Sequence, residues 1–190
     1  MATLDLTAKQ REFWRGCTHR WNIKCSATRS GKTYLDYFLI PRRLRDTAGL
    51  EGLAVIMGAT QATVRRNIIE PMKRIWGDDL VGDIRNDNTV QLFGERCFVI
   101  GADKVSQVDK VRGASIKYCY GDEVVTWHQE VFEMLKTRLD KPYSKCDATC
   151  NPGSPEHWLK AFVDSSGADI FYQQYTIFDN DFLDPAVLAD

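Results

Sequence analysis

Three short stretches of the sequence hold residue types that suit phosphate chemistry. The first is CSATRSGKT at 25–33, the second is Gly-Asp-Glu at 121–123, and the third is Asn-Pro at 151–152. Each follows an apolar run that predicts a buried strand. Because open α/β sheets bind ligands beyond the carboxyl ends of their strands, we expect the three stretches to lie together at one edge of a sheet.

The stretch at 25–33 has the composition of a phosphate-binding loop, in which backbone N–H groups surround an anion at the start of a helix. Lys32 would reach the outer phosphates and the Thr33 hydroxyl would bind Mg²⁺. Ser26 stands where the motif G-x-x-x-x-G-K-[ST] has its first glycine, and serine fits if that position needs no positive φ. A chance Gly-Lys-Thr at a helix end is the alternative. The loop residues expected to bind nucleotide are Ser26, Ala27, Thr28, Arg29, Ser30, Gly31, Lys32 and Thr33.

The acidic pair Asp122 and Glu123 follows the apolar run IKYCY, which Gly121 interrupts. In metal-assisted phosphoryl transfer, Asp122 would hold Mg²⁺, directly or through water, and Glu123 would polarise the attacking water. The alternative is an exposed Asp-Glu in an ordinary turn. Asn151 ends the run KCDATC, where its amide would contact the terminal phosphate or orient water, although Asn-Pro-Gly by itself is a common turn.

The remaining pattern alternates strands with helices, which predicts an α/β fold with a mainly parallel sheet covered on both faces. Thr7, Thr60 and Ser154 are the expected helix caps, and breaks are expected near Pro41 and Pro71. The predicted strands are 21–27, 52–59, a hairpin over 88–102 that turns at 94–95, 116–124, 145–152 and 169–177. The predicted helices are 7–19, 32–46, 60–77, 128–139 and 154–164.

The composition is that of one globular domain of 190 residues, with 44% hydrophobic and 27% charged residues. No apolar run is long enough to span a membrane. The six cysteines do not have zinc-site spacing with the histidines, so we expect buried free thiols in a reducing compartment. Residues 1–45 carry ten Lys and Arg against three Asp and Glu. This basic excess suits a face that meets nucleotide or nucleic acid, or is plain surface charge.

Taken in order and spacing, SATRSGKT, YGDE and ATCNP resemble the ATPase region of the large terminase subunit of tailed bacteriophages. The resemblance covers nearly the whole chain and implies a P-loop NTPase fold of the RecA-like type, with ATP and Mg²⁺ as cofactors. It matches Lys32 and Thr33 to the Walker A pair, Asp122 and Glu123 to the Walker B pair, and Asn151 to the coupling motif.

Three further residues take roles from this resemblance or from their position. Gln10, in LTAKQREFW, sits where the family often has a glutamine that contacts adenine, although an exposed helical glutamine is equally ordinary. Arg112 lies ten residues before Asp122 and precedes a glycine. We expect it to act as an arginine finger on the nucleotide of a neighbouring subunit. Arg29 is the rival within the same subunit, and a surface salt bridge is the other interpretation of Arg112.

The family packages viral DNA into procapsids in the cytoplasm of the host bacterium. The resemblance therefore implies double-stranded DNA, the portal or procapsid and the small terminase subunit as partners, a homo-oligomeric ring, and no membrane. Arg65 and Arg66 are candidate DNA contacts, or part of a solvated helix face. Two other interpretations stay open: a small P-loop kinase, and a nucleotide-binding interaction module with little turnover.

The family normally has a second, nuclease domain. We expect the ATPase domain to occupy 1–178 and a linker toward the nuclease domain to begin at 179–190. The late carboxylates Asp179, Asp181 and Asp184 lie within one short segment and lack separate sheet positions, so we interpret them as linker residues rather than a metal cluster.

Overall fold

The computed structural model describes residues 5–26 and 31–181 of the chain. Their strands form one seven-stranded sheet in the order β3-β4-β2-β5-β6-β1-β7, and only the β3–β4 pair is antiparallel. The predicted α/β fold with a mainly parallel sheet is confirmed. The strands are β1 (Trp21–Ser26), β2 (Leu53–Gly58), β3 (Thr89–Leu92), β4 (Glu95–Gly101), β5 (Ile116–Gly121), β6 (Lys145–Cys150) and β7 (Ile170–Tyr175).

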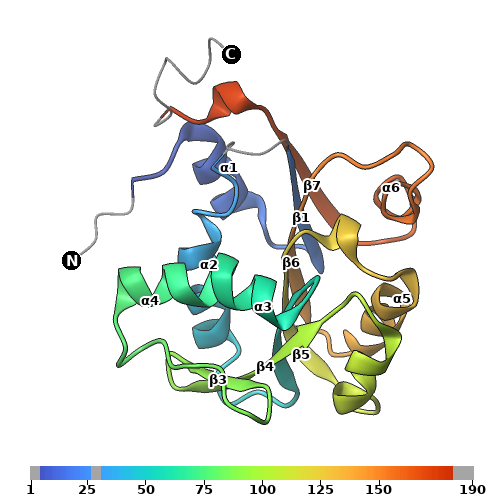
Figure 1. Cartoon of the computed structure of the whole chain (residues 1–190). Coiled ribbons are helices and arrows are strands. Elements are labelled where there is room, and N and C mark those ends of the chain that lie inside the picture. The colour runs from blue at the N-terminus through green and yellow to red at the C-terminus, as the bar shows by residue number, and fades with distance from the viewer. Residues whose placement is uncertain (1–4, 27–30, 182–190) are drawn as a thin grey trace.

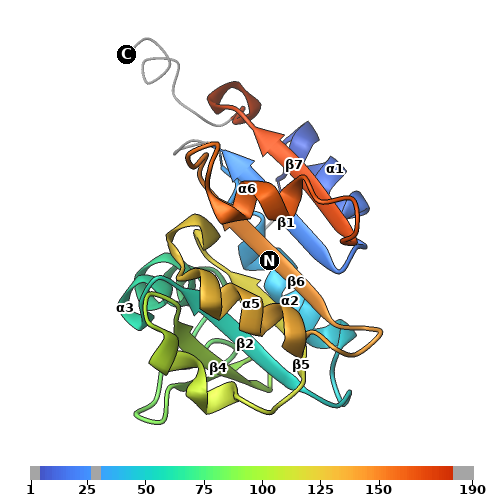
Figure 2. The same ribbon diagram turned by 90° about the vertical axis from the view of Figure 1, so that its right-hand side faces the viewer.

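Helices cover both faces of this sheet, as parallel strands require. Figures 1 and 2 show α5 and α6 on one face and the first four helices on the other. Two buried clusters of apolar side chains, one on each face, make up the main core. The helices are α1 (Ala8–Gly16), α2 (Asp36–Asp46), α3 (Gln61–Val64), α4 (Glu70–Trp76), α5 (Gln129–Arg138) and α6 (Trp158–Val163).

Pro41 does not break its helix as expected, whereas an irregularity does lie near Pro71, where the π-helical turn Arg65–Ile69 changes to α4. Pro41 lies inside α2, where its missing N–H leaves the carbonyl of Tyr37 without its usual helical donor. The indole Nε1 of Trp76 donates to that carbonyl at 2.9 Å, which offsets the loss and ties α4 to α2. Pro71 lies in the first turn of α4, a position that tolerates proline.

The helix starts differ from the sequence prediction at two places. Thr7 and Thr60 are N-caps with complete capping boxes, as predicted. The α6 helix, however, begins after His157, whose Nδ1 accepts from the N–H of Leu159 at 3.2 Å, and not at Ser154. After the phosphate loop, residues 32–35 form turns, and the regular helix α2 begins only at Asp36.

The β3–β4 hairpin turns one residue earlier than predicted. Leu92 pairs with Glu95, so Phe93 and Gly94 are the two turn residues, and both have positive φ (52° and 82°). A two-residue turn of this kind needs positive φ at both positions to match the twist of the strands. No helix in the described part of the chain is both long and apolar enough to cross a membrane.

Candidate functional site

The three stretches singled out in the sequence meet at one edge of the sheet. They follow β1, β5 and β6, which are parallel, and the sheet places β5, β6 and β1 side by side. The expectation that they lie together is therefore confirmed. Of the predicted phosphate loop, Ala27, Thr28, Arg29 and Ser30 lie outside the described residues.

Lys32 is the centre of this site. Its side-chain Nζ donates to the backbone carbonyl of Ser26 at 3.0 Å and to the Oδ1 of Asn151. The lysine is 7% exposed, and this burial lowers its pKa, while the negative charges of Glu123 and Asp122 oppose the shift. A buried cation held by two neutral oxygens is poised to bind an anion that enters the site.

Asn151 connects the lysine to the acidic pair. Its Nδ2 donates to the Oε1 of Glu123 at 3.3 Å while its Oδ1 accepts from Lys32. Glu123 has a left-handed backbone (φ 48°, ψ 55°), a conformation that costs free energy for a residue with a Cβ. Thr149 supports this turn by accepting from the Glu123 N–H through its Oγ1 at 3.1 Å.

Asp122 is buried and held by neutral donors. Its Oδ2 accepts from the Nδ2 of Asn67 at 2.8 Å, and its Oδ1 accepts from the hydroxyl of Thr149 at 3.2 Å. Burial raises the pKa of this carboxyl, and the hydrogen bond from Asn67 opposes that shift. A buried carboxylate supported mainly by neutral groups suits a cation, and oxygen ligands are those that Mg²⁺ prefers. The half-buried Thr33, the other predicted ligand, lies in the first turn after Gly31.

Sequence reasoning missed Asn67, which belongs to none of the three motif stretches. It sits in a π-helical turn, Arg65–Ile69, inserted between α3 and α4. The hydroxyl of Tyr37 donates to its carbonyl at 3.0 Å, and the Nε of Arg66 donates to its Oδ1 at 3.1 Å. Such turns are frequent at functional sites, but nothing in the local sequence distinguishes one from a regular helix.

The two departures from the expected motifs have structural reasons. Ser26 is the last residue of β1 and its φ is not positive, so this position does not require glycine. At Gly121, a Cβ would lie 2.9 Å from the ring of Trp127, whose Nε1 donates to the carbonyl of Asp122 at 3.0 Å. Glycine at 121 therefore allows the indole to lock the acidic turn.

Gln10 is buried, so the interpretation as an exposed helical glutamine is wrong. Its Oε1 accepts from the N–H of Thr7 and its Nε2 donates to the carbonyl of Gly31, both at 2.9 Å. These contacts tie the start of α1 to the phosphate loop. Gln10 also lines a cavity of about 300 Å³ beside Gly31, together with Tyr34 and Asn180. Its amide has a second N–H and a second lone pair with which to contact a base.

None of the three predicted arginines within the described residues contacts Lys32, the acidic pair or Asn151 directly, although Arg66 donates to Asn67. Arg112 is exposed and precedes β5, whose carboxyl end carries Asp122. The six residues of β5 separate the two ends by about 20 Å. The structure therefore does not bring Arg112 to the site of its own chain. Arg65 and Arg66 are exposed on the π-helical turn that carries Asn67.

Solved structures of phage packaging proteins share this fold. The large terminase of a thermophilic bacteriophage superposes with a TM-score of 0.83 and 25% identity over 96% of this chain, and the chain spans 48% of that terminase. The same protein has been solved with ATP-gamma-S, at a TM-score of 0.80 and 24% identity, with the same coverage of both chains. The ATPase domain of a Thermus phage large terminase superposes with a TM-score of 0.64 and 14% identity, covering 90% of this chain and 80% of that one.

A comparison with curated protein sequences gives no match. A family model described as the N-terminal part of the large terminase subunit of the T4-like-virus type matches residues 25–188. That range contains Lys32, the acidic pair and Asn151, and it covers most of the 190 residues. The chain therefore belongs to this family of large terminase subunits.

Proposed function

We propose that this chain is the ATP-hydrolysing motor domain of a viral DNA-packaging terminase, which couples hydrolysis to the movement of double-stranded DNA into a procapsid. The single observation that carries the proposal is the chain of contacts Lys32–Asn151–Glu123, with Asp122 beside it, at the edge of a parallel sheet. Family membership and a solved relative that holds ATP-gamma-S support the same conclusion.

Each residue of the cluster has one task in this proposal. Lys32 leaves the Ser26 carbonyl and binds the outer phosphates, and the N–H groups of the loop that contains Arg29 surround them. Asp122 and Thr33 would hold Mg²⁺, which neutralises charge on the phosphate oxygens when it is bound. Glu123 accepts the proton of the attacking water, and Asn151 orients Glu123 toward it. Gln10 and Tyr34 line the cavity that would take adenine.

The second part of the proposal concerns the partners of this chain. It goes beyond the chain itself, because the chain spans about half of the terminase it matches. One related structure is described as the N-terminal domain of a DNA packaging ATPase, from bacteriophage phi29. We infer that this chain works in the host cytoplasm with double-stranded DNA, the portal or procapsid, the small terminase subunit and copies of itself in a ring. Arg65 and Arg66 are exposed and are proposed to contact DNA phosphates.

The decisive experiment measures ATP hydrolysis by this chain with and without double-stranded DNA over a range of protein and salt concentrations. We expect Mg²⁺-dependent release of phosphate that DNA stimulates at low salt and that salt suppresses. Replacing Arg65 by alanine should reduce the stimulation and leave DNA-free hydrolysis unchanged, whereas Arg66→Ala also removes a hydrogen bond to Asn67. Transfer of the phosphoryl group to a small hydroxyl acceptor would instead identify a kinase, and ATP binding without turnover would identify an interaction module.

A further inference from the structure

The sheet contains two pairs of cysteines that face each other across neighbouring strands. Cys25 of β1 is in register with Cys150 of β6, and Cys119 of β5 is in register with Cys146 of β6. All four are free thiols. Residues in register on neighbouring parallel strands point to the same face, with Cα atoms about 4.8 Å apart. This separation lies within the range that a disulfide bond spans.

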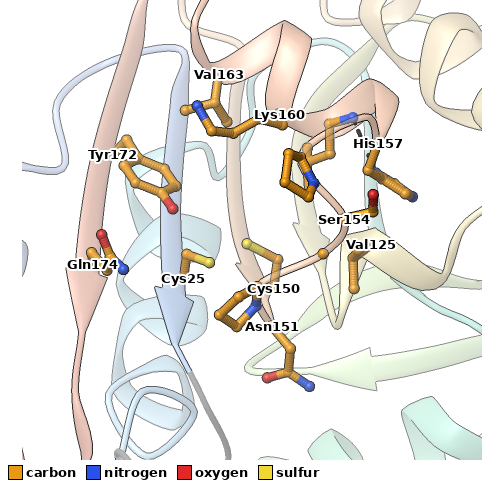
Figure 3. Close-up of a pocket in the computed structure, with 14 residues that line it drawn as sticks. Cys25, Val125, Cys150, Asn151, Ser154, His157, Lys160, Val163, Tyr172 and Gln174 are labelled. Carbon is orange, nitrogen blue, oxygen red and sulfur yellow. Dashed lines mark hydrogen bonds between the residues drawn. The ribbon is translucent and has the colours of Figure 1, made fainter.

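The two pairs differ in what surrounds them. Cys25 and Cys150 line a cavity of about 230 Å³ between the strands β1, β6 and β7 and the helix α6. Figure 3 shows both sulfur atoms directed toward this cavity, with Tyr172 beside them. All four cysteines are buried, with Cys25 and Cys150 5% and 2% exposed and Cys119 and Cys146 0% and 1% exposed, and all four belong to the same apolar cluster. The difference between the pairs is this cavity, which leaves space in front of the sulfur atoms of Cys25 and Cys150 for a small molecule.

The two pairs also differ in the acidity of their thiols. Cys150 and Tyr172 lie beside Cys25 at the cavity, and the positive charge of Lys32 favours its thiolate form. These neighbours lower the pKa of Cys25 to about 6, which favours its thiolate form. The neighbouring Cys25 and burial raise the pKa of Cys150, just as burial and the neighbouring Cys119 raise the pKa of Cys146, so the difference between the pairs lies in Cys25. Cys25 thus has the character of an attacking thiolate, with Cys150 beside it as a resolving thiol.

Each cysteine of the first pair directly precedes a group that holds Lys32. Ser26, after Cys25, supplies the carbonyl that accepts from the lysine, and Asn151, after Cys150, supplies the side-chain oxygen. A group bound to either sulfur would disturb the contacts of Lys32 with Ser26 and Asn151. A bond between the two sulfurs would fix the ends of β1 and β6 to each other. The thiol pair is therefore placed to control the phosphate loop.

We propose that Cys25 and Cys150 form a thiol-exchange site that reacts with small disulfides and, by closing into a cross-strand disulfide, turns nucleotide binding off. The thiolate of Cys25 attacks one sulfur of the small disulfide, whose S–S bond breaks and releases one thiol after protonation. Cys150 then gives up its proton and attacks the Cys25 sulfur of the mixed disulfide, which releases the second thiol. The protein loses two protons and two electrons, and the small disulfide takes them up and is reduced to two thiols.

The exchange chemistry is tested by mass spectrometry, independently of any nucleotide. The folded chain is treated with hydroxyethyl disulfide near pH 7.5, free thiols are blocked, and digested peptides are mapped. We expect a Cys25–Cys150 disulfide to form at least tenfold faster than any modification of Cys119 or Cys146. In urea, all the cysteines should react, which shows that the selectivity belongs to the fold. Equal rates at the two pairs in the folded chain would overturn the proposal.

Single alanine variants separate the attacking thiol from the resolving thiol. Cys150→Ala should stop at a stable mixed disulfide on Cys25, and Cys25→Ala should leave Cys150 unmodified. Cys119→Ala is the matched control from the neighbouring pair and should behave as the parent does. If Cys25→Ala fails to fold, the trapped adduct of Cys150→Ala still identifies the first nucleophile. A trapped adduct on any other cysteine would contradict the assignment.

The effect on nucleotide is measured by calorimetric titration of ATP before and after oxidation; this part rests on the proposed function. We expect oxidation to weaken ATP binding at least tenfold, dithiothreitol to restore it, and Cys150→Ala without its adduct to bind as the parent does. Unchanged ATP affinity after complete disulfide formation would overturn the control of the phosphate loop. A reduced chain that does not bind ATP at all would contradict the proposed function but not the exchange chemistry.

Discussion

Lys32, Asn151 and Glu123 form a chain of hydrogen bonds in which each side chain fixes the next. The lysine is the positive group of the cluster. The Glu123 side chain is a carboxylate that takes no part in the hydrogen bonds that hold Asp122. Binding and water activation therefore depend on different residues, although one amide connects them. Substitutions at the two ends of this chain should separate the two functions.

Glu123→Gln keeps the shape of the side chain and removes the base, so we expect ATP binding within a few-fold of the parent and loss of turnover by at least a hundredfold. Lys32→Ala removes the positive charge, and both binding and hydrolysis should fall. ATP affinity by calorimetry and phosphate release check both variants. Equal hydrolysis rates for Glu123→Gln and the parent would show that Glu123 is not the base.

Asn67 should set the Mg²⁺ dependence of the reaction, because its Nδ2 donates to Asp122. Removing a group that orients a metal ligand typically costs 10–100-fold in metal affinity. We therefore expect Asn67→Ala to need roughly tenfold more Mg²⁺ for half-maximal hydrolysis and for Mg²⁺-dependent ATP binding.

Gln61→Ala is the matched control on the preceding helix α3, since it loses one contact with the carbonyl of Val99 and lies outside the hydrogen bonds of Asp122. A Mg²⁺ titration that is the same for Asn67→Ala and Gln61→Ala would exclude the positioning role of Asn67.

At the scale of elements, a buried ion pair connects the phosphate-loop strand to the helix that follows the loop. The Nζ of Lys24 on β1 donates to the Oδ1 of Asp36 on α2 at 2.5 Å, and the hydroxyl of Tyr120 on β5 donates to the Oδ2 of Asp36 at 2.9 Å. Both side chains of the pair are fully buried. This arrangement connects β1, α2 and β5, the three elements whose ends carry the phosphate loop and the acidic pair.

Breaking this pair on one side should be costly, because it leaves an unpaired charge in the core. We expect Lys24→Met to lower the free energy of unfolding by about 3–5 kcal/mol. The double variant Lys24→Met, Asp36→Asn should recover most of this loss, since the uncharged amide still accepts from Tyr120.

Urea unfolding followed by circular dichroism measures both effects. The exposed pair Lys136–Glu133 supplies the control, and Lys136→Met should change stability by less than about 1 kcal/mol. A double variant as unstable as Lys24→Met would show that the lost packing of the lysine matters more than the unpaired charge.

The strands, and which of them precede the site residues, were readable from the sequence. Buried parallel strands are continuous apolar runs, and the motifs follow them directly. Lys32, Asp122, Glu123 and Asn151 were found in this way. Asn67 could not be found, since only the fold brings the turn after Val64 to the acidic pair and only a π-helical turn directs it there. The pairing of Cys25 with Cys150 depends on strand register, which the sequence of neither strand specifies.

Helix ends were less predictable for a related reason. Pro41 predicts a break, but the indole of Trp76, thirty-five residues later in the chain, satisfies the carbonyl that the proline leaves free. Tertiary contacts of this kind override local preference, and their partners cannot be read from a local window.

At the scale of the whole molecule, Arg112 lies at the end of the sheet opposite the acidic pair. The proposed finger can therefore reach a nucleotide only across an interface between two copies, in a ring or a smaller assembly. Its neighbour Gly113 has a φ of 88°, which produces a sharp turn directly before β5 and leaves Arg112 exposed at the surface.

Mixing variants tests this arrangement. Arg112→Ala should abolish hydrolysis while ATP binding persists, and the activity of the parent per subunit should rise with protein concentration. A mixture of Arg112→Ala and Glu123→Gln should regain part of the activity, because one interface then combines an intact arginine with an intact glutamate. If hydrolysis is independent of concentration and the mixture stays inactive, Arg29 within the same subunit becomes the better candidate.

The contacts of Lys32 have a further consequence for the binding of phosphate. The lysine donates hydrogen bonds to Ser26 and Asn151, and Asn151 in turn donates to Glu123. A phosphate that binds Lys32 has to compete with these partners, so part of its binding free energy is used to break the hydrogen bonds of Lys32 to Ser26 and Asn151. The same exchange frees the Oδ1 of Asn151 from Lys32, while its Nδ2 can still donate to Glu123. Binding of a phosphate at Lys32 and the orientation of Glu123 are thus coupled through one amide.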